Sequence, residues 1–233
     1  MGIVARVVKR LQSDYFNAKI SLYGVLGLPA QTSQERQLFK RILDTFGNQV
    51  IRVFEWGSGH STIYYARYLN KRGVPFEWHS IDNNTIWHEK VRTLVNDNDL
   101  EPYVSLHLRE FIPFWEKPEW GRLPPGSGAF APTSANEASY IDCPRGLKGK
   151  FDIVLIDARF RRRCLQTARE VVRPDGIVIL HDAQKEQYHP GTEAFPFRTF
   201  ISSGSWYPLQ PSPNMVWVGS LEDGRIQAFL KSA

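Results

Sequence analysis

The sequence predicts an α/β fold with a doubly wound, mostly parallel sheet, an antiparallel edge near the C-terminus and a helical segment at the N-terminus. Three observations lead to this prediction. From residue 50 onward, short apolar segments alternate with helical segments, which is the pattern of consecutive βαβ units. A glycine-containing turn follows the first of these apolar segments, and acidic residues end several of them. With 233 residues, the chain is long enough for one large domain and short for two.

The strands and helices are expected in a regular order. Helices are predicted where apolar residues recur on one face, as Trp87, Val91 and Val95 do. The expected helices span about 61–71, 85–97 and 160–172. The expected parallel strands span about 50–55, 76–82, 102–108, 151–157 and 176–181. After residue 190 the pattern predicts two or three strands that pair antiparallel at one edge of the sheet.

Two segments fall outside this alternation. Residues 1–47 are expected to form a helical segment before a domain that spans 48–233, because apolar residues recur at helical spacing and a second helix is bounded by a Ser/Thr cap and Gly47. Residues 111–150 contain six prolines and many aromatic residues between the third and fourth strands. A loop of this length is typically a lid or binding loop. Its aromatic content favours a packed lid over disorder, and Tyr140 within it is a candidate acceptor contact.

Composition excludes several classes of protein. The chain has no apolar run of the roughly 18 residues that a membrane helix needs and no signal-peptide pattern, so a cytoplasmic protein is expected. The spacing of Cys143 and Cys164 indicates neither a disulfide framework nor a zinc site. A net charge of +5 without aromatic residues interleaved among the basic ones disfavours nucleic-acid binding. A small-molecule substrate is therefore the expected partner.

Charged residues stand at the ends of several predicted strands. In a doubly wound sheet, ligands bind outside the carboxyl ends of the strands. Glu55, Asp82 and Asp157 end three of the strands, and His181 and Asp182 follow a fourth. Because these ends meet at one edge of the sheet, the sequence predicts a site there.

The turn "GSGHST" at residues 57–62 connects the first strand to a helix. On its own it indicates only a tight connection or a backbone that approaches a ligand closely. A carboxylate such as Glu55 about 4 Å from a phosphate would cost on the order of 4 kcal/mol at an effective dielectric near 20, which disfavours a dinucleotide. Asp82 lies where an acid reaches a ribose diol. A ligand with a ribose, a cationic part and little phosphate fits, and S-adenosylmethionine is such a ligand.

These residues carry a family resemblance. "FEWGSGHST" resembles the E-x-G-x-G first motif of class I S-adenosylmethionine-dependent methyltransferases, and "WHSIDNN" is similar to their second acidic motif. "KFDIVLIDA" and "VVRPDGIVILHDA" resemble their fourth and fifth strands, so the likeness spans about 48–184. "IDARFRRRC" is also similar to a subgroup in which an Asp-(Gly/Ala)-Arg-x-Arg segment follows strand four. The resemblance implies a Rossmann-like fold.

The resemblance also implies roles for individual residues. Glu55 would lie near the methionine amine, Asp82 would bind the ribose hydroxyls and Asp157 would sit beside the sulfonium and the acceptor. The other implied cofactor contacts are the turn residues Gly57, Ser58 and Gly59, then Asn83 beside the adenine, and Arg109 and Glu110 at the adenine edge. The chain lacks a third glycine and has His60 and Ser61 in its place, which we expect to contact the cofactor or cap the helix.

Methyl transfer to a hydroxyl oxygen benefits from a proton acceptor or a metal ion. Asp157, His181 and Asp182 are candidates for this catalytic role. A divalent metal held by Asp157 and Asp182 is an alternative, although Mg²⁺ prefers oxygen ligands and His181 suits it poorly. His181 could equally orient Asp182 or cap the strand.

Arginines follow Asp157 in the run "ARFRRRC". Arg159 and Arg161, nearest the strand end, could bind an anionic acceptor, because guanidinium groups match carboxylate and phosphate geometry. A basic, solvated helix start explains them equally well. The leading hypothesis is therefore O-methylation of a small or sugar-like, anionic acceptor. The alternatives are a non-catalytic S-adenosylmethionine-binding partner protein and a nicotinamide-dependent oxidoreductase, which Glu55 disfavours.

Overall fold

The computed structural model describes residues 3–111, 134–206 and 213–231, and the side chains of the first helix from residue 10 onward. Seven strands form one sheet in the order β3-β2-β1-β4-β5-β7-β6. The strands are β1 (Ile51–Trp56), β2 (Phe76–Asp82), β3 (Val104–Leu108), β4 (Phe151–Ile156), β5 (Val172–Leu180), β6 (Phe197–Ser202) and β7 (Met215–Ser220). The first five run parallel, and β7 pairs antiparallel with both β5 and β6. This confirms the predicted fold class.

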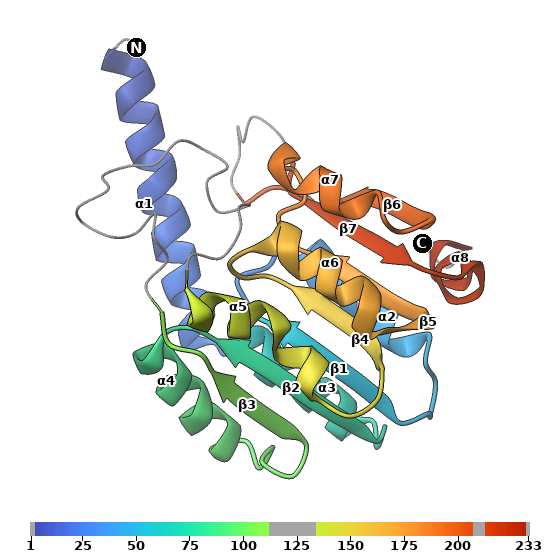
Figure 1. The fold of residues 1–233 in the computed structure, drawn as a ribbon. Coiled ribbons are helices and arrows are strands. Elements are labelled where there is room, and N and C mark those ends of the chain that lie inside the picture. Colours follow the sequence, from blue (N-terminus) through green and yellow to red (C-terminus); the bar gives the residue numbers. More distant parts are fainter. Residues whose placement is uncertain (1–2, 112–133, 207–212, 232–233) are drawn as a thin grey trace.

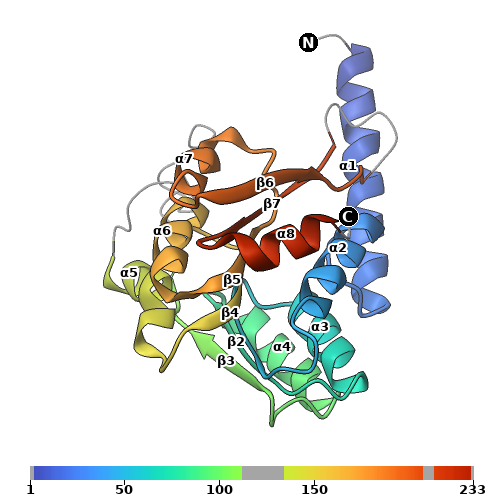
Figure 2. The same cartoon turned by 90° about the vertical axis from the view of Figure 1, so that its right-hand side faces the viewer.

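Helices cover both faces of the sheet (Figure 1). The longer ones are α1 (Ile3–Val25), α2 (Ser33–Asp44), α3 (His60–Lys71), α4 (Thr85–Asn96), α5 (Ala135–Asp142), α6 (Arg161–Val171) and α8 (Asp223–Lys231). Short helical turns are η4 (Cys143–Gly146), η5 (Glu186–Tyr188) and α7 (His189–Thr192). Figure 2 shows α2, α3, α4 and α8 on one side of the strands and α5, α6 and α7 on the other.

The central strands are apolar on both sides because each face of the sheet packs against a helical layer. Ile153 and Leu155 of β4 belong to the cluster that contains α2, α3 and α8, whereas the alternate residues Val154 and Ile156 belong to the cluster that contains α5 and α6. This alternation follows from the two-residue period of a strand. Alternate residues of a strand therefore face opposite helical layers, up to the end of the strand.

The N-terminal segment packs onto the sheet through α2. This helix begins at Thr32 with a capping box: the Thr32 hydroxyl accepts from the Glu35 amide, and the Glu35 carboxylate accepts from the Thr32 amide. Leu38, Phe39 and Ile42 are buried in the same core as β1. Helix α1 projects beyond the carboxyl ends of the strands (Figures 1 and 2). None of the helices in the described part of the chain combines the length and apolarity needed to cross a bilayer.

Two expectations about elements need correction. The segment after residue 190 contains two strands, as predicted, but its last part is the helix α8, whose Ile226 and Phe229 lie one helical turn apart and are both buried. Part of the expected loop at 111–150 is also helical: α5 has its own capping box at Ser134, and its Tyr140 is packed in the core. The remainder of the expected lid, residues 112–133, lies outside the described residues.

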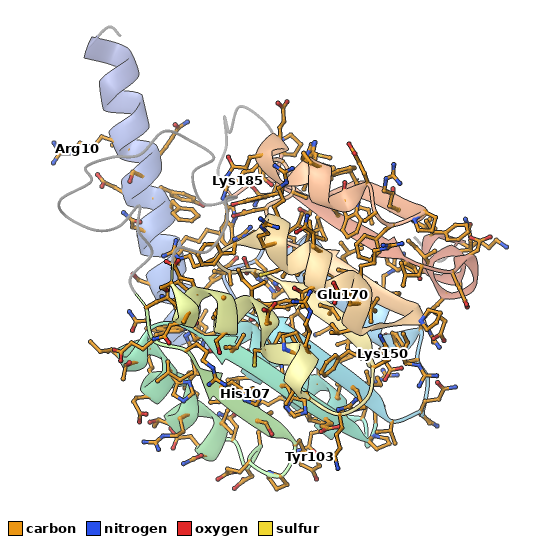
Figure 3. All side chains as sticks on the ribbon, viewed as in Figure 1. Arg10, Tyr103, His107, Lys150, Glu170 and Lys185 are labelled. Carbon is orange, nitrogen blue, oxygen red and sulfur yellow. The ribbon has the colours of Figure 1, made fainter. Side chains whose placement is uncertain are left out.

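The carboxyl ends of the parallel strands meet at one edge of the sheet. Lys185, which follows β5, lies at this edge, whereas Tyr103 and Lys150, which precede β3 and β4, lie at the opposite one (Figure 3). Strand order reverses between β1 and β4, because β2 follows on one side of β1 and β4 on the other. Such a switch point is where open α/β sheets bind their ligands.

Candidate active site

A cavity of about 740 Å³ opens at the carboxyl ends of β1, β2 and β4. This volume is in the range of small-molecule sites. The predicted site residues that line it are Gly57, Ser58, Gly59, His60, Ser61, Asp82, Asn83, Tyr140, Asp157, Arg159 and Arg161. The remaining predicted residues lie outside its lining, namely Glu55, Arg109, Glu110, His181 and Asp182. The structure thus gathers the glycine turn and the acids after β2 and β4 around one space.

The turn after β1 requires glycine for two reasons. Gly57 has a φ of +98°, which residues with a side chain rarely adopt, and a Cβ at this position would lie 2.5 Å from the Asp157 carbonyl oxygen. Gly59 lies over the Trp87 ring, whose edge is 3.5 Å from where a Cβ would be. Trp87 Nε1 also donates to the Ser58 carbonyl at 2.7 Å. The turn is therefore fixed between β4 on one side and α4 on the other.

Replacing Gly57 with alanine is expected to lower the free energy of unfolding by about 1–3 kcal/mol, because the backbone is strained at positive φ and the Asp157 carbonyl must move. Chemical denaturation measures this change. Gly146→Ala is the matched control, since a Cβ there meets nothing within 4 Å, and it should change stability by less than about 0.5 kcal/mol. Equal effects of the two substitutions would contradict the assignment.

Glu55 occupies a different environment from the one expected. Its carboxylate is fully buried beneath the turn and accepts hydrogen bonds from Ser61 Oγ (2.6 Å), Thr62 Oγ1 (2.6 Å), Trp78 Nε1 (3.0 Å) and Ser80 Oγ (3.0 Å). Burial raises its pKa to about 7, and the four hydrogen bonds oppose this increase. Glu55 therefore anchors the first turn of α3 to β1 and β2. The expected repulsion of a phosphate by a charged Glu55 loses its basis, because the group is buried and half protonated near neutrality.

The raised pKa of Glu55 predicts a pH-dependent stability. Below about pH 4.5 the carboxyl is protonated in both states, whereas between pH 4.5 and 7 only the unfolded state has lost the proton. Relative to a Glu55→Gln variant, the free energy of unfolding of the wild type should therefore fall by about 3 kcal/mol over this interval and stay level above it. Denaturation at several pH values measures the difference. Glu101 is exposed, so the difference between the wild type and the control Glu101→Gln should not change with pH. If the difference between the wild type and Glu55→Gln is also independent of pH, the pKa of Glu55 is not raised.

Asp82 ends β2, Asn83 follows it, and both line the cavity. The Asp82 carboxylate accepts from the Asn84 backbone at 2.8 Å, and Asn83 Nδ2 donates to the Phe111 carbonyl at 2.9 Å. Desolvation raises the pKa of Asp82, while hydrogen bonds from the Asn84 and Asn83 backbone lower it. No side chain of a described residue donates to the Asp82 carboxylate, whose hydrogen bonds come from the backbone. Asp82 thus presents an acceptor oxygen to the cavity.

Arg109 and Glu110 do not reach the cavity. Arg109 Nε donates to Ser139 Oγ at 2.8 Å, and Glu110 Oε1 accepts from Thr85 Oγ1 at 2.8 Å, with both side chains on the exposed surface. Their expected contact with the adenine edge is not present in this arrangement. His60 does line the cavity, beside Trp87 at a ring distance of 6.1 Å. Burial and the nearby Lys90 lower its pKa, which keeps the imidazole neutral at pH 7.

The three predicted catalytic residues belong to one ion-pair network. Arg161 NH2 donates to Asp157 Oδ1 at 2.9 Å, and Arg161 NH1 lies 3.2 Å from Asp182 Oδ2. His181 Nδ1 lies 2.9 Å from the same Asp157 oxygen, and its Nε2 lies 3.4 Å from the buried Glu35 carboxylate of α2. The network joins the ends of β4 and β5 to the N-terminal segment.

Two of these residues do not fit the expected catalytic role. His181 is buried, and although burial lowers its pKa, the Asp157, Glu35 and Asp182 carboxylates together raise it well above the usual value. A protonated imidazole away from the cavity is no proton acceptor. Burial raises the pKa of Asp182, but the cations His181, Arg161 and Lys185 lower it by more, so the net shift is downward. Of the three, only Asp157 faces the cavity.

The expected metal site and one expected substrate contact are also corrected. The Arg161 guanidinium lies between Asp157 and Asp182, where a shared metal ion would have to be. Among the described residues, no group of three or more His, Cys, Asp or Glu side chains is arranged to hold a metal. Arg161 also donates to the Ala158 and His181 carbonyls. Its donors are thus committed inside the protein. Arg159 is exposed and lines the cavity.

Several cavity residues were not predicted. One wall comes from the N-terminal segment, through Ile20, Gly24, Leu28, Pro29, Ala30 and Gln31. Ile86, Trp87 and Lys90 of α4 form another wall. The apolar face of α4 was expected to pack in the core, and Val91 and Val95 are buried there, but Trp87 lines the cavity. Ile86, outside that face, is 84% exposed and also lines the cavity. Tyr140 was predicted as an acceptor contact; it does line the cavity, but only 1% of it is exposed.

Comparison with known proteins identifies the family. A family model described as a methyltransferase domain matches residues 54–183, which is more than half of the chain. No curated protein matches the sequence. Similar solved structures include the O-methyltransferase from Bacillus cereus in complex with SAH, at 14% identity and a TM-score of 0.57, with 89% of this chain and 90% of that chain covered.

Two further structures share the fold. The O-methyltransferase TomG from Streptomyces achromogenes in complex with SAM has 13% identity and a TM-score of 0.53, covering 89% of this chain and 90% of that chain. Spermidine synthase from Thermotoga maritima has 13% identity and a TM-score of 0.51, covering 81% of this chain and 59% of that chain. At these identities the likeness shows the fold alone, and the family match over residues 54–183 assigns the activity. The chain therefore belongs to the methyltransferase domain family and is an S-adenosylmethionine-dependent methyltransferase of the class I, Rossmann-like fold.

Proposed function

We propose that this protein transfers a methyl group from S-adenosylmethionine to a hydroxyl oxygen of a small or sugar-like acceptor that carries a negative charge. The observation that carries the proposal is the cavity itself. It brings a glycine turn that allows close approach of the backbone, together with the carboxylates of Asp82 and Asp157, to the strand-order switch point. These are the groups that a nucleoside with a cationic centre requires.

In this proposal the cofactor lies across the turn after β1. Asp82 would accept hydrogen bonds from the ribose hydroxyls, and the exposed Ile86 with Trp87 would offer an apolar surface to the adenine beside Asn83. The backbone of Gly57, Ser58 and Gly59 would approach the chain that carries the sulfonium. Glu55 supports this arrangement from below, by holding Ser61 and Thr62 in place. When bound, the cofactor supplies an activated methyl group.

Asp157 is the residue we assign to the acceptor proton. Arg161 and His181 both bind its Oδ1, whereas no described residue hydrogen-bonds its Oδ2. The carboxylate is therefore oriented by two cations with one oxygen left for a hydroxyl group. A positioned base of this kind accelerates proton transfer by about 10²–10⁴-fold. Arg159, exposed in the wall next to Asp157, would bind an anionic group of the acceptor.

Asp82→Asn is expected to raise the dissociation constant of S-adenosylmethionine by roughly 10- to 100-fold. A hydrogen bond to a charged group contributes about 1.5–3 kcal/mol, and the amide presents a donor where the ribose needs an acceptor. Isothermal titration measures the change, with the exposed Glu101→Gln as the control that should bind like the wild type. Unchanged affinity in Asp82→Asn would refute the assignment of Asp82 to the ribose hydroxyls.

The acceptor class is tested by a panel of hydroxyl compounds. Release of S-adenosylhomocysteine is followed for neutral sugars, sugar acids, sugar phosphates and phenols, each with the wild type and Arg159→Ala. Turnover with an anionic member, together with an increase of its KM of at least about tenfold in Arg159→Ala, is the expected result. Turnover of neutral acceptors alone, or equal KM values in both proteins, would refute the anionic acceptor.

A further inference from the structure

Gln31 is a buried side chain whose amide nitrogen has no partner. It lies in the connection between α1 and α2, is 1% exposed and lines the cavity. The Tyr65 hydroxyl donates to Gln31 Oε1 at 2.5 Å, while Nε2 makes no hydrogen bond to any described residue. Burial raises the pKa of Tyr65 well above 10, so its hydroxyl stays protonated and able to donate. The Gln31 carboxamide is thereby oriented, with a donor left over.

Unpaired buried donors are uncommon because each one costs free energy that a folded protein does not recover. A second unpaired polar atom belongs to the same cavity wall: Ser58 Oγ, in the glycine turn, is buried and lacks a partner among the described residues. Two such atoms around one cavity indicate a ligand group that satisfies both. Because an amide nitrogen can only donate, that group must be a hydrogen-bond acceptor.

The position of Gln31 indicates which part of the cofactor it meets. Asp82 ends β2, on one side of β1, whereas Thr32 and Glu35, which follow Gln31 in the chain, contact residues beyond β4 and β5 on the other side. Thr32 Oγ1 donates to the Ser203 carbonyl at 2.5 Å, and Glu35 lies 3.4 Å from His181, directly after β5. Gln31 and Asp82 both line the cavity around the glycine turn, and the segment that carries Gln31 continues toward the β5 side. A cofactor with its ribose on Asp82 extends its amino-acid end toward Gln31.

We propose that Gln31 Nε2 and Ser58 Oγ form a carboxylate subsite that binds the amino-acid end of the cofactor. The acceptor groups at that end are the two carboxylate oxygens, since the ammonium and the sulfonium are cationic and accept no hydrogen bond. The N-terminal segment is then part of the binding site, with Tyr65 positioning Gln31. This inference rests on the proposed function, because it takes the ribose to lie on Asp82.

The test compares two nucleosides that differ at this end. S-adenosylhomocysteine has the amino-acid group, and 5′-methylthioadenosine lacks it. In isothermal titration, Gln31→Ala should raise the dissociation constant of S-adenosylhomocysteine by about tenfold or more and leave that of methylthioadenosine unchanged. Ser58→Ala should show the same selective loss of affinity for S-adenosylhomocysteine. If Gln31→Ala fails to fold, Ser58→Ala alone tests the inference. Gln34→Ala, an exposed glutamine on α2, is the control and should bind both nucleosides like the wild type.

Gln31→Glu gives a test of sign. A carboxylate at this position should repel the carboxylate of S-adenosylhomocysteine and weaken binding more than Gln31→Ala does. Tighter binding in Gln31→Glu would overturn the inference, since it would show that the ammonium lies there. Equal losses for both nucleosides in Gln31→Ala would also overturn it, because Gln31 would then only shape the cavity. If the wild type binds neither nucleoside, the proposed function fails instead, and the two failures are distinguishable.

Discussion

Asp157→Asn is expected to lower kcat by about 100- to 10,000-fold, with the dissociation constant of S-adenosylmethionine changed by no more than a few-fold. The amide cannot take the proton of the acceptor hydroxyl, which removes the contribution of a positioned base. It still accepts a hydrogen bond from Arg161 through its oxygen, so the loop after β4 should keep its conformation. The measurement is steady-state turnover with an acceptor from the panel, together with titration of the cofactor.

Asp182→Asn is the matched control for this prediction. Asp182 belongs to the same ion-pair network through Arg161 and Lys185 but lies outside the cavity lining. Its substitution should lower stability and leave kcat within a few-fold of the wild type. If Asp157→Asn keeps most of the activity, or if both variants lose activity equally, Asp157 acts only as part of the network and another group takes the proton.

Arg161→Met is expected to lower the free energy of unfolding by about 3–5 kcal/mol. Its side chain is 10% exposed and bonds two carboxylates, Asp157 and Asp182, which would face each other without this cation. Methionine retains most of the apolar contact with the Tyr188 ring, over which the guanidinium lies at 5.4 Å. The loss should therefore reflect removal of the shared cation, with His181 left beside Asp157 and Lys185 left beside Asp182. Urea denaturation measures it.

Arg163→Met provides the control for Arg161→Met. Arg163 lies on the same helix, is exposed and binds only Gln166 among the described residues, so its loss should cost less than about 0.5 kcal/mol. The double variant Arg161→Met with Asp182→Asn should recover part of the lost stability, because it removes one of the two carboxylates that Arg161 bridges. A loss below 1 kcal/mol in Arg161→Met, or no recovery in the double variant, would show that the network contributes little.

The fold could be predicted from the sequence because its signals are local. Strand β1, the turn at Gly57 and the start of α3 are adjacent in the chain, and their order with the later strands determines a parallel sheet with its switch point after β1. Gly57 and Asp82 were predicted in the site for the same reason. Each ends or follows a strand, and strand ends meet at one edge.

The environments of the charged groups could not be predicted in the same way. Ser61 and Thr62 lie within one turn of Glu55, but Trp78 and Ser80 reach it only because β2 pairs beside β1 in a register that places Ser80 opposite Glu55. Arg161 was separated from Asp157 by four residues and interpreted as a substrate contact. Its second carboxylate, Asp182, comes from another strand end. Such partners depend on tertiary packing.

The wall formed by the N-terminal segment had no sequence signal of its own. Gln31 follows a proline and an alanine in a connection between helices, which predicts a loop and nothing more. Its role depends on Tyr65, which is 34 residues away, and on a cavity that exists only when α2 packs on the sheet. The segment that the sequence placed before the methyltransferase-like part of the chain therefore forms one wall of the cavity.

A crystal structure of the protein with S-adenosylhomocysteine tests the central claim most directly. We expect the nucleoside in the cavity at the carboxyl ends of β1, β2 and β4, with both ribose hydroxyls within hydrogen-bond distance of the Asp82 carboxylate and the amino-acid end beside the connection between α1 and α2. Density for the ligand at any other place, or a ribose that does not contact Asp82, would contradict it.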